Sequence, residues 1–199
     1  MKSPSWSLLI GLALTLIAVA LGTTLYRVGA LKGVAIERGT DGPHRLVARE
    51  HLGPYHGISD VISAVEAWAK EHGEPCAQAF GEYFDDPNTT DSDRLRSRGG
   101  CILSNDAIAR LAESGGLPEG TTVSELPSRE ALIAVFEGAP SIGPLKVYPK
   151  VFDEMKRLEL RLNGPIFEIY EAHVEDARAG EASPTAGLTR YVFPVESAR

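Results

Sequence analysis

The stretch GPIFEIYE, residues 164–171, has the β-branched and aromatic composition of a strand. Side chains alternate along a strand, so Ile166, Glu168 and Tyr170 share one face while the residues between them point to the other. Both faces carry large apolar groups, which predicts a strand that is covered on both sides. A buried carboxylate costs several kcal/mol unless it is paired, protonated or bound to a ligand. Glu168 is therefore the candidate functional residue.

A related pattern occurs earlier in the chain, at residues 79–85. Glu82 aligns with Glu168 at an offset of 86 residues, and the turn glycines Gly53 and Gly138 are 85 residues apart. A one-residue insertion or deletion reconciles the two offsets, so we interpret the chain as two diverged copies of one unit. Because a polar loop follows Glu82, that residue is expected to be a solvated or edge carboxylate rather than a ligand.

Each copy is expected to contain two strands, a helix and two further strands. The expected strands cover residues 34–38, 45–52, 77–84, 100–104, 121–126, 130–137, 165–171 and 188–195. Apolar residues at intervals of three and four predict helices over residues 58–71 and 142–160, and a shorter linking helix over residues 105–114. Pro149 lies inside the second of these helices and predicts a kink or a restart.

The N-terminal segment differs in composition from the rest. Ser7 to Leu25 is a run of nineteen residues without a charge, long enough to cross a bilayer as a helix. Arg27, Lys32 and Arg38 follow the run and only Lys2 precedes it, so the positive-inside rule predicts a single-pass anchor (residues 1–27) with a cytoplasmic C-terminal domain. The alternative is a signal peptide cleaved near residues 18–20.

The two cysteines are expected to remain unpaired. Cys76 precedes one expected strand and Cys101 begins the next, so an antiparallel hairpin would place their sulfurs at opposite ends. Two cysteines also match no zinc motif, and the histidines lack metal-ligand spacing. The sequence therefore predicts no metal and no cofactor, and reduced cysteines would agree with a cytoplasmic domain.

The overall charge excludes one class of partner. The formal net charge of the 199 residues is -7, and no basic stripe interleaved with aromatic residues is present. Nucleic-acid binding requires such an electrostatic footprint. The chain also contains no P-loop and no dinucleotide-binding glycine pattern. A nucleic-acid partner and nucleotide chemistry of these kinds are not expected.

Several short motifs, taken in order, resemble the GyrI-like small-molecule-binding domains. In the second copy they are Phe136-Glu137-Gly138, the Gly164-to-Tyr170 strand and the closing Tyr191-Val192-Phe193-Pro194-Val195. In the first copy they are Gly53-Pro54-Tyr55 and Tyr83-Phe84-Asp85-Asp86-Pro87. The resemblance covers residues 33–196, with halves of about 33–104 and 121–196.

The resemblance implies an α+β fold, in which the strand-helix-strand-strand units form an eight-stranded antiparallel sheet with two helices on one side. It also implies a cleft between the halves where a buried glutamate meets lipophilic cations, as in multidrug-binding bacterial relatives. Glu168 matches that glutamate. The candidate aromatic walls are Tyr170, Tyr55, Tyr83, Phe136, Tyr148 and Trp68.

Three functions follow from the resemblance. The first is a membrane-anchored sensor or sequestering protein for a small lipophilic or cationic molecule. The second is a hydrolase of strained electrophilic rings, with Glu168 as base and Tyr55 or Tyr170 as acid. The third is an adaptor with an occluded cleft that recruits an unidentified protein. The anchored arrangement is similar to that of animal receptors for selective autophagy of the endoplasmic reticulum, but the chain ends at Arg199 without their long disordered tail, so that role is not expected.

Overall fold

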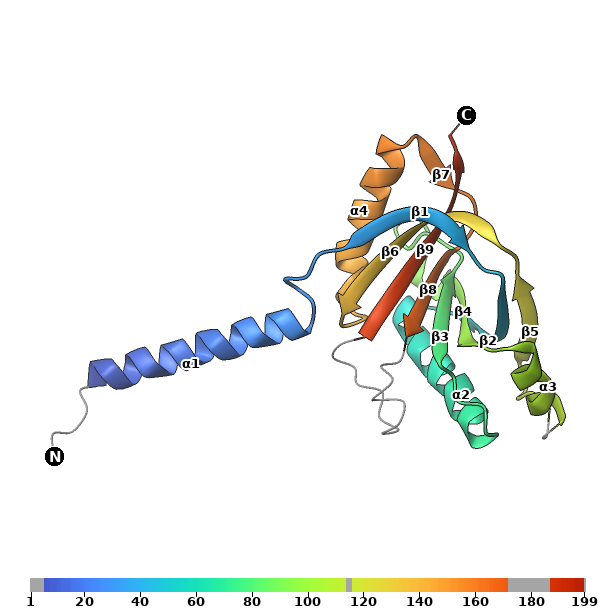
Figure 1. Cartoon of the computed structure of the whole chain (residues 1–199), viewed down its shortest axis with the longest axis horizontal. Helices are drawn as coiled ribbons and strands as arrows, with labels where there is room; N and C mark the ends of the chain where they lie inside the picture. The colour runs from blue at the N-terminus through green and yellow to red at the C-terminus, as the bar shows by residue number, and fades with distance from the viewer. Residues whose placement is uncertain (1–5, 114–115, 172–186, 199) are drawn as a thin grey trace.

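The computed structural model describes residues 6–113, 116–171 and 187–198, which form one antiparallel sheet with helices and a separate N-terminal helix (Figure 1). The expected α+β fold is confirmed. The helices are α1 (Trp6–Arg27), α2 (Ile58–Glu71), α3 (Asn105–Glu113) and α4 (Gly143–Arg157). The strands are β1 (Ala35–Asp41), β2 (His44–Leu52), β3 (Gln78–Tyr83), β4 (Arg96–Ile102), β5 (Thr121–Leu126), β6 (Arg129–Gly138), β7 (Leu160–Leu162), β8 (Ile166–Glu171) and β9 (Gly187–Ser197).

The order of the strands confirms the internal duplication. Eight strands lie in the order β1-β6-β9-β8-β3-β4-β2-β5, and the short β7 pairs with β9. Exchanging β1 with β5, β2 with β6, β3 with β8 and β4 with β9 reproduces the same order read from the other end. The two copies are therefore related by a pseudo-twofold axis between β3 and β8, the central pair of the sheet.

The register of that central pair corrects the alignment of the two glutamates. Glu168 pairs with Gly81, whereas Glu82 pairs with Phe167. Directly paired residues in an antiparallel sheet face the same side, so Glu82 and Glu168 point to opposite faces. The prediction that Glu82 is the counterpart of Glu168 is wrong, because a shift of one residue moves every side chain to the other face.

Helices α2 and α4 cover one face of the sheet, each over its own half. Val65 and Ala69 of α2 pack on Val47 of β2 and Cys101 of β4. The corresponding core of the second half joins α4 to β6 and β9 and comprises Val147, Val151, Met155, Leu132, Ala134, Phe136, Tyr191 and Phe193. The apolar stripes predicted from helical spacing are the surfaces that make these contacts. The central strands β3 and β8 lie between the two helices.

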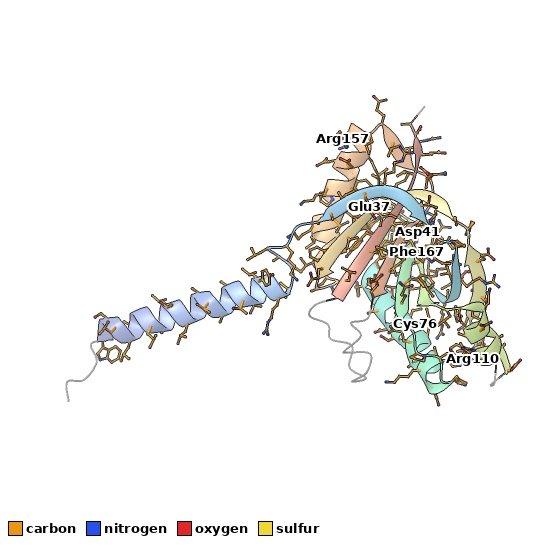
Figure 2. All side chains as sticks on the ribbon, viewed as in Figure 1. Glu37, Asp41, Cys76, Arg110, Arg157 and Phe167 are labelled. Carbon is orange, nitrogen blue, oxygen red and sulfur yellow. A yellow bond between two sulfur atoms is a disulfide. The ribbon has the colours of Figure 1, made fainter. Side chains whose placement is uncertain are left out.

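The opposite face of the sheet is also buried, although α2 and α4 do not cover it. Phe80, Phe167 and Ile169 on this face are fully buried. The corner turns, where β1 passes into β2 and β5 into β6, fold over it: His44 stacks on the ring of Phe167 at 5.7 Å, and the Arg129 guanidinium lies 5.5 Å from the same ring. Figure 2 shows Asp41 and Phe167 in this region, beside the arching β1. Burial on both faces explains why β8 carries large apolar side chains on both of its faces.

Two expected boundaries differ from the structure. Helix α4 runs through Pro149 without interruption, so the predicted restart is not found. The helix ends at Arg157 rather than at residue 160, because the backbone of Glu159 has a φ of 54° and turns the chain into β7. Strand β4 begins at Arg96, four residues earlier than expected, and this changes the position of Cys101 within the strand. The expected loop over residues 172–187 lies mostly outside the described residues.

Helix α1 is long and apolar enough to span a membrane, and it extends away from the sheet (Figure 1). The segment that follows it is docked on the domain. The Nζ atom of Lys146 donates hydrogen bonds to the carbonyl oxygens of Gly29 at 3.1 Å, of Ala30 at 2.6 Å and of Lys32. Gly29 is buried against Phe136, where an added Cβ would lie 2.6 Å from the ring. The connection to α1 is therefore an integral part of the domain.

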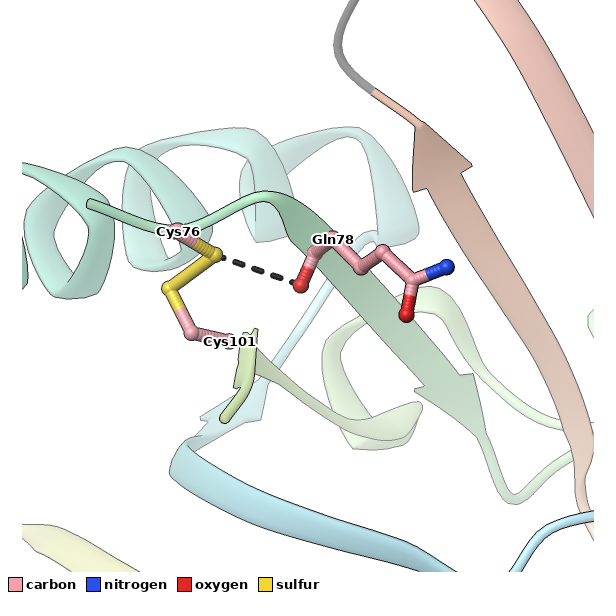
Figure 3. The surroundings of a disulfide bond; sticks show 3 residues. All are labelled: Cys76, Gln78 and Cys101. Atoms are coloured by element: carbon pink, nitrogen blue, oxygen red, sulfur yellow. Dashed lines mark hydrogen bonds between the residues drawn. A yellow bond between two sulfur atoms is a disulfide. The ribbon is translucent and has the colours of Figure 1, made fainter. Parts of the chain in front are cut away.

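The cysteines form a disulfide, which corrects the prediction that they stay unpaired. Cys76 lies just before β3, and Cys101 is near the end of β4, where it pairs with Ala79 at the start of β3. The two Cα atoms are 5.6 Å apart and the sulfurs are bonded (Figure 3). The prediction was wrong because it placed Cys101 at the beginning of its strand, and hence at the wrong end of the hairpin.

At Gly100, the backbones of β2 and β4 approach each other closely. An added Cβ would lie 2.0 Å from the carbonyl oxygen of Val47, a backbone atom that cannot rotate away. We expect Gly100→Ala to lower the free energy of unfolding by about 1–3 kcal/mol through overpacking, measured by urea denaturation. Gly33→Ala is the matched control, because no atom lies within 4 Å of its added Cβ. Equal denaturation midpoints for the two variants would contradict the predicted close approach.

Candidate functional site

The candidate site lies on the helix-covered face, where β3 and β8 meet between α2 and α4. Glu168 projects from β8 toward this face and is only 4% exposed. Its register partner on β3 is Gly81, which has no side chain, and its partner on β9 is Tyr191. The sheet thus surrounds the carboxylate with a glycine on one side and an aromatic ring on the other.

Two tyrosine hydroxyls donate to the two carboxylate oxygens of Glu168. Tyr148 reaches down from α4 and donates to Oε1 at 2.8 Å, and Tyr170 of β8 donates to Oε2 at 2.8 Å. The hydroxyl of Tyr83 lies 3.0 Å from that of Tyr170. Because Tyr170 uses its proton toward Glu168, Tyr83 is the donor in that contact. The carboxylate thus accepts from two hydroxyls of the second copy, and Tyr83 of the first copy joins the cluster through Tyr170.

Burial controls the ionisation of this group. Removal from water raises the pKa of Glu168 to about 7, while the hydrogen bonds from Tyr148 and Tyr170 lower it and so limit the rise. Burial, followed by the charge of Glu168, raises the pKa of both tyrosines well above the ordinary value. The tyrosines are therefore hydrogen-bond donors at neutral pH, and Glu168 is close to half ionised.

Within the described ranges, no lysine, arginine or histidine forms an ion pair with Glu168. Burial also raises the pKa of Glu66, which is on α2 one helical turn from Ile62. Ile62 packs in the cluster that contains Tyr83 and Tyr170. The site combines a buried acid with aromatic hydroxyls, and no cation of residues 6–113, 116–171 or 187–198 pairs with it.

The structure separates the predicted aromatic residues into two groups. Tyr148, Tyr170 and Tyr83 belong to the hydrogen-bonded cluster, and Tyr55 lies edge-on to Tyr83 at 4.9 Å, with its hydroxyl donating to the carbonyl of Asp85 at 2.6 Å. Tyr55 is thus a second layer behind Tyr83.

The other two predicted aromatics pack elsewhere. Phe136 is buried in the core under α4, next to the segment that follows α1. Trp68 packs in the α2 core near the disulfide and lies 5.2 Å from the ring of His72. Phe136 shares its core with Tyr148 and Tyr191, but neither Phe136 nor Trp68 belongs to the hydrogen-bonded cluster around Glu168. The sequence places Phe136 in a strand and Trp68 in a helix, but only the packing shows which core each side chain enters.

Three aromatic residues around Tyr148 were not among the predicted site residues. Phe193 lies 5.1 Å from the Tyr148 ring, Phe152 lies 6.1 Å away and Tyr191 lies 6.3 Å away, all edge-on. A signal was present in the sequence, because Tyr191 and Phe193 alternate on one face of β9. Assigning that face to the site requires the pairing of β9 with β8, which is not visible in the sequence.

Glu82 has a different role from the one expected. It is 1% exposed and accepts a hydrogen bond from Nε of Arg98 at 2.5 Å, on the face opposite Glu168. The prediction of a solvated or edge carboxylate is therefore wrong. Arg98 is on the adjacent strand and directly opposite Glu82 in register, so the buried acid has a cation of its own. Glu82 thus has a paired arginine, whereas Glu168 accepts hydrogen bonds from two neutral tyrosines.

A surface hollow of about 480 Å³ lies elsewhere, at the edge formed by β1 and β6 near the end of α1. Its lining residues are Lys32, Gly33, Val34, Ala35, Val135, Glu137 and Leu188. None of them belongs to the tyrosine cluster. Tyr83, Tyr148 and Tyr170, which surround Glu168, are themselves half-buried.

Comparison with known proteins gives a weak sequence match and a clear structural one. The chain is 27% identical over 84 residues to DNA gyrase inhibitor 2 of Dickeya dadantii (strain 3937), a match that covers 42% of this chain and 45% of that protein. The chain therefore matches less than half the length of this relative. No family model matches the chain.

The fold is shared with several solved structures, two of which are compared below. The C-terminal domain of EcmrR superposes with a TM-score of 0.60 at 9% identity, over 82% of this chain and 98% of that domain. A hydrolase from Listeria innocua superposes with a TM-score of 0.52 at 13% identity, over 81% of this chain and 91% of that protein. At these identities the likeness concerns the fold. The duplicated sheet with two helices is thus an architecture shared with these proteins, and the weak sequence match points to the GyrI-like domains.

Proposed function

We propose that the domain of residues 33–196 binds a small lipophilic or cationic molecule at Glu168, and that α1 holds it at a membrane as a sensor or sequestering module. The observation that carries the proposal is the lack of a counter-charge within the described part of the chain. Glu168 is buried there, and two tyrosine hydroxyls donate hydrogen bonds to it. The similarity to GyrI-like small-molecule-binding domains supports the same function.

The chemistry of the cluster favours a delocalised organic cation. A cation beside Glu168 would neutralise the carboxylate and recover part of the free energy lost by burying it. The rings of Tyr148, Tyr170 and Tyr83 offer aromatic faces, each worth about 0.5–2 kcal/mol to a nearby cation. A large aromatic cation carries little solvation free energy to lose, so it can enter a dry site that a small hydrated ion would avoid.

The test is a thermal-shift experiment on the full-length chain in lipid nanodiscs with tetraphenylphosphonium as the probe. At one hundred times the dissociation constant, binding adds about 2.7 kcal/mol to the free energy of unfolding, which raises Tm by about 5–10 °C. Glu168→Gln is expected to abolish the shift, and Glu50→Gln, an exposed site on β2, is expected to retain it. Triphenylphosphine oxide is the neutral control. An equal shift in the Glu168→Gln variant would contradict the proposal.

Cation affinity is expected to depend on pH. With a pKa of about 7, Glu168 is half ionised at neutral pH and almost fully protonated at about pH 5. A cation that requires the ionised carboxylate should therefore bind about 50-fold more weakly at pH 5 than at pH 7. Titration calorimetry at the two pH values measures the ratio, and Glu50→Gln, which keeps the Glu168 carboxylate, should show the same ratio as the wild type. Equal dissociation constants for the wild type would show that the charge of Glu168 does not take part.

A hydrolase is the second candidate, favoured by the pKa of Glu168 near neutrality and by its contacts with protonated tyrosines. The Glu168 carboxylate would take a proton from a water molecule as that water attacks a carbon of a strained ring. The ring C–O bond would break as the leaving oxygen takes the proton of Tyr170. Turnover of an aryl epoxide, lost in Glu168→Gln, would support this reaction. Neither binding nor turnover, together with a stable protein partner, would instead favour the adaptor.

A further inference from the structure

The disulfide between Cys76 and Cys101 is a core feature of the domain. Figure 3 shows the bond beside a helix. Cys101 is fully buried, and the two cysteines pack with Val65 and Ala69 of α2. The bond joins the segment before β3 to the end of β4, so it ties the hairpin to the helix above it. Both cysteines of the chain are used in it.

A bond of this kind depends on the compartment. Disulfides form and persist in oxidising environments, whereas cytosolic thiols are kept reduced. Forming the bond removes two electrons and two protons from the thiols of Cys76 and Cys101, and a disulfide-bonded oxidant accepts them by thiol–disulfide exchange. The cytosol lacks a sustained supply of such an oxidant, while the compartments to which proteins are exported contain one.

The junction with α1 keeps the domain next to the C-terminal end of this helix. The helix ends at Arg27, and the next five residues are docked on the domain by Lys146 and by the hydrogen bond from the Ala139 N–H to the Val28 carbonyl at 3.0 Å. No flexible linker separates these parts. The domain therefore lies on the side where Arg27 leaves the membrane.

We infer that this side is the oxidising one, so that the domain of residues 33–196 is exported and carries the Cys76–Cys101 bond in the cell. The expectation of a cytoplasmic domain relied on unpaired cysteines, which the structure overturns, and on the charges that flank α1. The charge bias points the other way, with Arg27, Lys32 and Arg38 on the domain side. It is a statistical preference, whereas the disulfide requires an oxidant.

This inference changes the source of the ligand. If the Glu168 site binds as proposed, its ligand comes from the compartment outside the cytoplasm. This step alone rests on the proposed function. The location of the domain does not depend on ligand binding. The cation experiments on purified protein can therefore fail while the location is confirmed, and the reverse is also possible.

Reporter fusions test the location in cells. The full-length chain is fused at Arg199 either to alkaline phosphatase, which folds only where disulfides form, or to green fluorescent protein, which fluoresces in the cytoplasm. In a bacterial host we expect an active phosphatase fusion and a dark fluorescent fusion. The opposite pair of results would overturn the inference.

Thiol trapping tests the bond in the same cells. After acid quenching and denaturation, a polyethylene-glycol maleimide should add nothing to the wild type without reductant and should add two labels after reduction, one for each cysteine. The double variant Cys76→Ala, Cys101→Ala should remain unlabelled in both conditions. Two labels on unreduced wild-type protein would overturn the inference even if the phosphatase fusion were active.

Discussion

The stability of the wild-type chain should fall by about 3 kcal/mol as the pH rises from about 4.5 to about 7, relative to the Glu168→Gln variant. The pKa of Glu168 is about 7 in the folded protein against an ordinary value of 4.5. The native state therefore holds this proton more tightly than the unfolded chain does. The resulting stabilisation is complete below about pH 4.5 and is lost as the pH approaches 7.

The experiment compares urea denaturation of the two proteins across this pH range. The glutamine cannot ionise, so the variant should gain stability relative to the wild type by about 3 kcal/mol between pH 4.5 and pH 8. Any constant cost from altered hydrogen bonds to Tyr148 and Tyr170 cancels in that difference. Glu50→Gln controls for the loss of a charge at an exposed site. Parallel profiles for wild type and Glu168→Gln would show that Glu168 has an ordinary pKa.

Reduction of the disulfide should lower the free energy of unfolding by about 3 kcal/mol and lower Tm by about 6–12 °C. The bond joins residues 25 positions apart, and closing a loop of that length removes conformational freedom from the unfolded chain. The wild type is melted with and without dithiothreitol. The double variant Cys76→Ala, Cys101→Ala should melt at one temperature in both conditions, close to that of the reduced wild type.

A wild-type Tm that does not respond to dithiothreitol, under conditions where maleimide labelling proves reduction, would contradict this prediction. The measurement is independent of the location inferred above, since it concerns the energetic contribution of the bond in purified protein. A large decrease in Tm would additionally explain why the domain benefits from an oxidising compartment. Because the bond joins buried Cys101 to the half-buried Cys76 beside α2, we also expect its loss to loosen the packing of this helix on the sheet.

Much of the fold could be predicted from local patterns. Alternation located the strands, three-and-four spacing located α2 and α4, and the uncharged run located α1. The identification of Glu168 as a buried acid in a two-sided strand followed from the same alternation. These properties depend on residues within a few positions of one another, which the sequence displays directly.

The contacts that make the site could not be predicted, because they depend on register and on packing between distant segments. The pairing of Gly81 with Glu168 put Glu82 on the opposite face, and the longer β4 brought Cys101 to Cys76. Tyr148 reaches Glu168 from a helix 20 residues away in the sequence. A single-residue shift in strand pairing reverses the faces without altering the apolar pattern enough to reveal it. The sequence therefore determined the type and approximate position of most strands and helices, whereas the start of β4, the short β7 and the contacts between side chains were decided by the tertiary structure.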